Sequence, residues 1–290
     1  MNQFLFPLLL LLITSLNGTS QVETIQSQIQ IADELLKKNK PQESVKLLNS
    51  FKKDVYNHIE IISPFYSLLI QAEGELNEKQ AIRLKQEFLF YDGITNHIKD
   101  VNTSYSGNDK SELNKLELYY AQFKVAYELA EYFDKTGELS KCEYYYQLIE
   151  EKFRIPDGCG NSFAEEDYRL NNKIAKLQFE QSKYHRCFKT LTKYISWSPN
   201  IINEDPTTDY EMFVFCIKKI FSKDYIQQEI RRIESEIVVE GKTRIYSLFD
   251  EDFHQHFDPR MEIENNTTAK KGQNPIDLFH DWYVYKQLNK

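Results

Sequence analysis

The chain has 290 residues, of which 41% are hydrophobic and 28% are charged, and this composition excludes a disordered protein. Its net charge of −8 argues against nucleic acid as a partner, because an acidic chain repels phosphate backbones. The sequence has 19 Tyr and 19 Phe but only 9 Gly and 8 Pro, which favours long helices packed side by side.

The first 20 residues are typical of a secretory signal peptide. Their apolar stretch, residues 4–13, is too short to span a bilayer, which needs about 20 residues. Gly18 and Ser20 occupy the −3 and −1 positions of a cut before Gln21, although no Lys or Arg precedes the apolar stretch. No later segment has the length of a membrane span. We therefore expect a soluble mature chain that is periplasmic, cell-surface or secreted; a buried N-terminal helix is the alternative.

Residues 21–240 show apolar residues at helical spacing, and short polar turns divide them into helix pairs. The expected turns are Asn39–Pro41, Asn77–Lys79, Thr136–Gly137, Ser182–Lys183 and Ser222–Asp224. A helix–turn–helix unit repeated in this way predicts an all-α fold, an α-solenoid of about five antiparallel helix pairs. An especially long helix is expected over residues 111–135, and Asp209 is a candidate cap for the helix that follows it.

The helix pairs resemble tetratricopeptide repeats, which have a large–small step on the first helix and a small residue where the second helix crosses it. Bulky residues follow four and seven positions later, and a Pro often closes the unit. The third pair matches with Leu129, Ala130, Phe133, Gly137, Leu139, Cys142, Tyr146 and Ile149. The fourth matches with Ile174, Ala175, Tyr184, Cys187, Leu191, Tyr194 and Pro199.

The other three pairs match this pattern less fully. The first has Ile31, Ala32, Leu35, Ser44, Leu48 and Phe51. The second has Leu68, Leu69, Ala72 and Ala81, but Lys85 stands where a bulky apolar residue is expected. The fifth has Phe215, Cys216 and Tyr225, with Gln228 at the small position.

The resemblance implies a non-catalytic scaffold or adaptor, without a cofactor, that binds a protein or peptide in a concave groove lined by first helices. The exposed groove residues would be Gln71, Gln122, Glu128, Lys173 and Gln178. The acidic chain would favour basic partners. A self-associating part of a cell-surface assembly is an alternative function, and the sequence predicts no oligomeric state.

Four cysteines in an exported chain allow two disulfides with three connectivities. Cys142, Cys187 and Cys216 occupy small positions of the repeats, where a thiol packs as a compact apolar group, so we expect them in the core. Cys159 lies in the turn-rich segment 154–163, which we interpret as a connection between helices. A disulfide or a reactive thiol at Cys159 stays open as an alternative.

Residues 241–290 depart from the helical pattern and are expected to form an irregular C-terminal extension or cap. Leu278, Phe279, Trp282 and Tyr285 would cover the last apolar face, as a short helix or a strand. The extension also contains the best candidate metal ligands, His254, His256 and Asp258, which would share one face of a strand. A metal-binding or enzymatic role of this segment is the second alternative function; a solvated acidic turn is the simpler interpretation.

Overall fold

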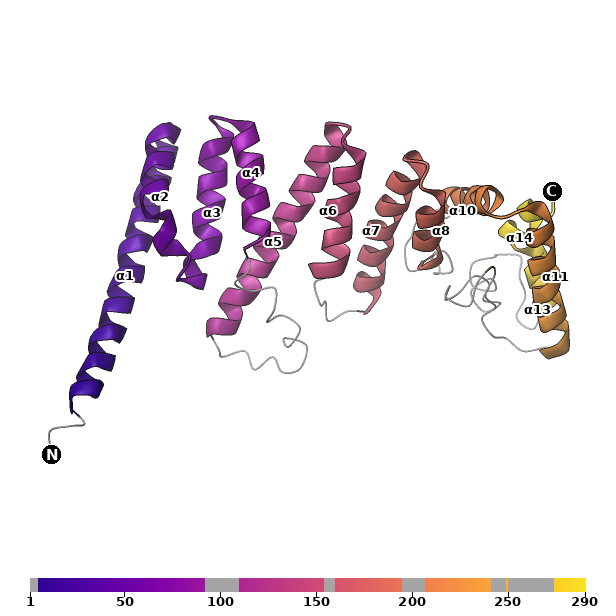
Figure 1. Cartoon of the computed structure of the whole chain (residues 1–290), viewed down its shortest axis with the longest axis horizontal. Coiled ribbons are helices and arrows are strands. Elements are labelled where there is room, and N and C mark those ends of the chain that lie inside the picture. Colours follow the sequence, from indigo (N-terminus) through magenta and orange to yellow (C-terminus); the bar gives the residue numbers. More distant parts are fainter. Residues whose placement is uncertain (1–4, 92–109, 154–159, 195–206, 241–248, 250–273) are drawn as a thin grey trace. The chain divides into compact units, whose positions relative to one another are not determined.

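The computed structural model describes residues 5–91, 110–153, 160–194, 207–240, 249 and 274–290, and it describes side chains from residue 21 onward except at 110–113, 160–164 and 238–240. Every regular element within these ranges is a helix, and they contain no strand, which confirms the expected all-α class (Figure 1). The chain divides into two compact units. The first comprises Met1–Tyr132 with Glu151–Ile155, and the second comprises Phe133–Glu150 with Pro156–Lys290.

The first unit consists of helices that pack on their neighbours in chain order. They are α1 (Leu5–Lys37), α2 (Pro41–Val55), α3 (Ile59–Gly74), α4 (Glu78–Leu89) and the part of α5 (Lys110–Lys135) that ends at Tyr132. Helix α1 packs on α2, α2 on α3, and α3 on α4. Their shared core contains Leu48, Phe65, Tyr66, Leu69 and Phe88, all of them buried. Packing between consecutive helices is what a helical repeat requires.

The second unit is also built from consecutive helices. It contains α6 (Leu139–Lys152) as far as Glu150, α7 (Gly160–Glu180), α8 (Tyr184–Thr192), α10 (Thr207–Ile220), α11 (Lys223–Glu240), α13 (Pro275–Asp281) and α14 (Tyr283–Leu288). Helix α7 packs on α8, α8 on α10, and α10 on both α11 and α14. The core of this unit includes Phe188, Leu191, Tyr194, Phe213 and Ile233.

All five expected turns separate helices in the structure. Their local chemistry explains why the helices stop there. Asn39, Ser182 and Gly137 have positive φ angles of 58°, 58° and 74°, a conformation that ends a helix and that Gly and Asn adopt most easily. The Asn77 side chain accepts a hydrogen bond from the Gln80 backbone N–H at 3.3 Å and so caps the start of α4.

Small residues that were matched to the repeat pattern are buried in the helical core. Ala32 and Ser44 are fully buried, and the Ser44 hydroxyl donates to the Ala32 carbonyl at 2.9 Å. Cys142 and Cys187 are fully buried at the equivalent positions. Three large apolar residues matched to the pattern are instead exposed: Ile31 (50%), Phe215 (40%) and Tyr225 (38%). In α11 the core stripe starts one residue later than expected and consists of Ile226, Ile230, Ile233 and Ile237.

The C-terminal segment expected to be irregular contains two short helices, α13 and α14. Leu278, Phe279 and Trp282 are buried in the core of the second unit, so the helical alternative holds for residues 275–288. Asn274 caps α13 by accepting a hydrogen bond from the Ile276 N–H at 3.2 Å. Asp209 does not precede α10 but lies in its first turn, where it is buried and accepts hydrogen bonds from Tyr168 and Asn172.

Candidate functional site

A cleft of about 600 Å³ lies between α3, α4 and α5 in the first unit. Its apolar lining is Ile70, Ala81, Ile82, Phe88, Ala121 and Val125. Its polar lining is Ser67, Gln71, Glu78, Lys85, Lys124, Glu128 and Tyr132, and Gly74 completes the wall. A concave surface with an apolar base and a few polar groups is the usual form of a binding site.

Two residues, Lys85 on α4 and Gly74 on α3, border the cleft. Lys85 stands on α4 where the repeat pattern calls for a bulky apolar residue, and its side chain lines the cleft. Gly74, the last residue of α3, has no side chain, and a Cβ placed there would already lie 4.0 Å from the Ala81 Cβ. A bulky residue at either position would occupy part of the cleft.

The cleft is held on one side by polar contacts between α4 and α5. Lys85 Nζ lies 2.8 Å from Glu128 Oε2, and the two side chains are 19% and 38% exposed. Gln122 Nε2 donates to the Phe88 backbone carbonyl at 2.9 Å. These two contacts fix the register of the antiparallel helices and thereby the positions of the groups along the cleft.

Four other polar groups of the cleft make no hydrogen bond or ion pair within the described residues. They are the exposed side chains of Ser67, Gln71, Glu78 and Lys124, which together come from all three helices. The Gln71 amide offers both donors and an acceptor, Glu78 offers a carboxylate, and Lys124 offers an ammonium group. The cleft thus presents apolar surface together with hydrogen-bonding groups that are available to a ligand.

The structure places the five expected groove residues in different environments. Gln71 and Glu128 line the cleft. Gln122 and Gln178 are buried, so the expectation that they are exposed is wrong. Lys173 is exposed in the second unit, where its Nζ donates to the Tyr146 hydroxyl at 3.3 Å. Sequence reasoning did not assign Lys124 or Tyr132 to the groove, and it noted Lys85 only as a mismatch with the repeat pattern.

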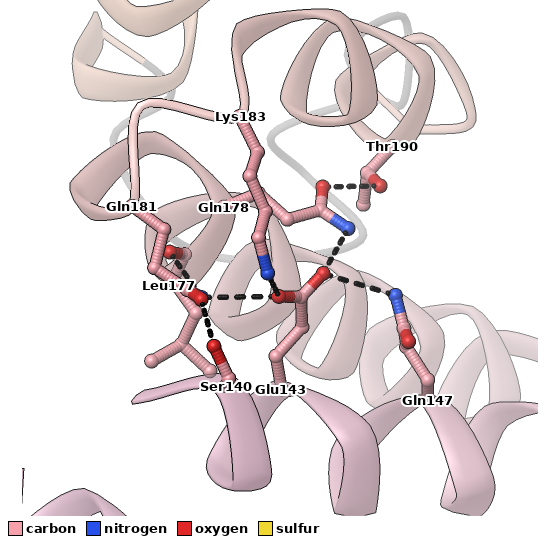
Figure 2. Close-up of polar contacts among 8 residues, drawn as sticks. All are labelled: Ser140, Glu143, Gln147, Leu177, Gln178, Gln181, Lys183 and Thr190. Carbon is pink, nitrogen blue, oxygen red and sulfur yellow. Dashed lines mark hydrogen bonds and ion pairs between the residues drawn. The ribbon is translucent and has the colours of Figure 1, made fainter. Parts of the chain in front are cut away.

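The second unit contains a polar network around a carboxylate that is 2% exposed, that of Glu143 on α6 (Figure 2). Lys183 Nζ donates to it at 2.6 Å, Gln181 Nε2 at 3.0 Å, Gln178 Nε2 at 3.1 Å and Gln147 Nε2 at 3.2 Å. Burial raises the pKa of Glu143, but the hydrogen bonds from Lys183 and Gln178 outweigh it and hold the pKa below its usual value. Two donors reach each carboxylate oxygen, so the network joins α6 to α7 and to the start of α8.

A similar cluster surrounds Glu87 in the first unit. The hydroxyls of Tyr56 and Tyr66 donate to Glu87 Oε1 at 2.8 and 2.7 Å, and Lys52 Nζ lies 2.7 Å from the same oxygen. Burial raises the pKa of Glu87, and the hydrogen bonds from Lys52, Tyr66 and Tyr56 lower it further than burial raises it. Burial also raises the pKa of Tyr66. The arrangement joins α2, α3 and α4, because Lys52, Tyr66 and Glu87 come from these three helices.

The three described cysteines are free thiols buried in the cores, as expected. Burial raises the pKa of Cys142 to about 12. A hydrogen bond with Cys216, together with burial, raises the pKa of Cys187. Because the thiolate is the nucleophile and metal ligand, neither Cys142 nor Cys187 is suited to either role at neutral pH. Cys159 lies outside the described residues.

The expected metal ligands, His254, His256 and Asp258, also lie outside the described residues. Within those residues, no three His, Cys, Asp or Glu side chains are grouped so that they would hold a metal ion. In the part of the chain whose side chains are described, no helix combines the length and the apolar character needed to cross a membrane. Comparisons with protein-family models, with characterised proteins and with solved structures find no match for this chain.

Proposed function

We propose that this chain is an exported, non-catalytic binding protein that holds an extended segment of a partner protein in the cleft between α3, α4 and α5. The observation that carries the proposal is the composition of the cleft. Its base is apolar, while Gln71, Glu78 and Lys124 keep hydrogen-bonding groups that no described residue occupies. An apolar base gives binding energy and convergent polar groups give orientation.

The length of the cleft supports a peptide segment as its occupant. Its lining runs along α5 from Ala121 to Tyr132, which corresponds to about 16 Å at the rise of an α-helix. An extended chain covers that length with about five residues. The cleft is therefore suited to a short linear segment, and such segments are recognised by hydrogen bonds to their backbone together with apolar contacts to their side chains.

The tetratricopeptide-like features of the sequence support the same function. The packing of helices in chain order agrees with a repeat architecture, and proteins of that architecture bind ligands on the surfaces that their repeats form. Export follows from the expected signal peptide at residues 1–20. If that expectation is correct, the N-terminal residue of the mature protein is Gln21, which N-terminal sequencing of the chain from its native cells would establish.

Site-specific photo-crosslinking in the native cells tests the proposal. A photoreactive residue replaces Ile82, which lines the cleft, or Lys79, which is exposed on the same helix outside it. We expect a crosslink from position 82 to one defined segment of one partner, and none to that segment from position 79. Adding Lys85→Phe, which fills the cleft, should abolish the crosslink, whereas Lys79→Phe should not. A stable partner whose crosslink at position 82 survives Lys85→Phe would refute the proposal.

A further inference from the structure

The charged groups of the cleft are ordered along its length. Glu78 is the first residue of α4, beside the turn from α3, and Lys85 lies two helical turns further on. Lys85 pairs with Glu128 of α5 at 2.8 Å, and because α5 runs antiparallel to α4, Lys124 lies one turn beyond this pair. Glu78 and Lys124 are therefore about 16 Å apart along the helix axes, on opposite sides of the central ion pair.

The central pair neutralises itself, and this leaves the ends of the cleft with opposite charges. Lys85 and Glu128 are partners of each other, whereas Glu78 and Lys124 have no charged partner within the described residues. A ligand that lies along the cleft thus meets a free carboxylate near the α3–α4 turn and a free ammonium group at the other end. Between them, Gln71 of α3 offers an amide that can accept from and donate to one peptide unit.

We infer that the segment bound in this cleft is dipolar. It is an extended stretch whose basic side chain faces Glu78 and whose acidic side chain faces Lys124, with aliphatic residues between the two. The inference rests on the proposed function and gives it a ligand class. The two charged side chains belong about five positions apart, because an extended chain rises about 3.3 Å per residue. This class differs from the merely basic partner that the net charge of the chain favours.

Fluorescence anisotropy with synthetic peptides tests the inference on the full chain. Each peptide is blocked at both termini, has four aliphatic residues in the centre and carries one charged residue at each end. Two peptides carry Lys at one end and Glu at the other, in the two possible orders. A third peptide carries Lys at both ends, and a fourth carries Glu at both ends. At low salt, we expect the better Lys/Glu peptide to bind at least about fivefold more tightly than either like-charged peptide.

Charge-reversed variants show whether the two named residues cause the preference. Glu78→Lys should make the peptide with Glu at both ends the tightest ligand, and Lys124→Glu should do the same for the peptide with Lys at both ends. The control Glu75→Lys makes the same change in net charge as Glu78→Lys, but at an exposed residue outside the cleft lining. It should leave the ranking of the peptides by affinity unchanged.

The possible failures are distinguishable. If all peptides bind equally and Lys85→Phe abolishes their binding, the charge inference is overturned and the peptide cleft stands. If reversal at position 75 changes the order as much as reversal at position 78, the preference reflects net charge and the inference is again overturned. If no peptide binds and no partner crosslinks at position 82, both the inference and the proposed function are wrong.

Discussion

Lys183 and Glu143 form an ion pair of 2.6 Å that joins the start of α8 to α6. The Glu143 side chain is only 3% exposed, whereas that of Lys183 is 31% exposed, so the cation keeps part of its hydration while the anion depends on protein donors. Three glutamine amides complete its hydrogen bonds, as Figure 2 shows. A buried carboxylate with a full set of donors makes its surroundings sensitive to the loss of any one group.

The first prediction concerns the stability of this network. Replacing Glu143 by Leu should lower the free energy of unfolding by about 2–4 kcal/mol, because Lys183 and buried amides lose their acceptor. Urea denaturation measures this change. The matched control is Glu150→Leu on the same helix, whose partner Lys193 is 52% exposed, and it should cost less than about 1 kcal/mol. Equal costs for the two variants would contradict the structural role assigned to Glu143.

The second prediction is a pH dependence. The pKa of Glu143 is lower in the folded chain than its usual value, so its contribution to stability is fully present above the unfolded pKa, about 4.3, and is lost as the pH falls through the folded pKa. Glu87 contributes with the same sign. The difference in unfolding free energy between the native chain and Glu143→Leu isolates Glu143. This difference should stay constant from pH 7 to about pH 4.3 and shrink as the pH falls further through the folded pKa. A difference that stays constant there as well would show that the pKa is not lowered.

The third prediction separates stability from binding in the cleft. Lys85→Phe removes an ion pair that is partly exposed and worth at most about 1 kcal/mol, and it adds apolar contact with the cleft base. Its free energy of unfolding should therefore stay within about 1 kcal/mol of the native value while peptide binding is lost. Lys79→Phe is the control with the same chemical change. A large loss of stability in Lys85→Phe alone would mean that the cleft does not accept the ring.

Much of the helical architecture could be predicted from the sequence, because its signals are local. A residue such as Gly137 or Asn39 ends a helix through its own backbone preference, and three of the five expected turns contain a residue with a positive φ angle, Asn39, Gly137 or Ser182. The burial of Cys142 and Cys187 could be predicted as well, because a small residue at a helix crossing has few alternatives to the core.

The cleft could not be predicted, because it depends on contacts between residues distant in the chain. Lys85 and Glu128 come from helices whose register no local pattern specifies. The same limit explains the error at Gln122 and Gln178. Both flank a core stripe, and only the position of a neighbouring helix decides whether such a residue is exposed; here the Gln122 amide donates to Phe88 and the Gln178 amide donates to Glu143.

The fourth prediction is that Cys142, Cys187 and Cys216 are unreactive in the folded chain. Burial raises the pKa of Cys142 to about 12, so almost none of its thiolate is present at pH 8. Brief treatment with iodoacetamide followed by mass spectrometry should leave all three unmodified, and treatment in urea should modify them. Cys142→Ala should cost little stability, because the side chain loses a single heavy atom, its sulfur. Rapid labelling of any of the three in the native chain would contradict their place in the core.

The fifth prediction concerns the C-terminal helices. Trp282 is 3% exposed between α13 and α14, where its ring packs near that of Phe279, at 6.2 Å between centroids, within the core of the second unit. Trp282→Ala should lower the free energy of unfolding by about 3–5 kcal/mol, because it removes a large buried side chain and leaves a cavity. Lys286→Ala, at an exposed position of α14, should change it by less than about 0.5 kcal/mol. If both variants unfold at the same urea concentration as the native chain, residues 275–288 do not contribute to the core. The expectation that this segment covers an apolar face would then be wrong.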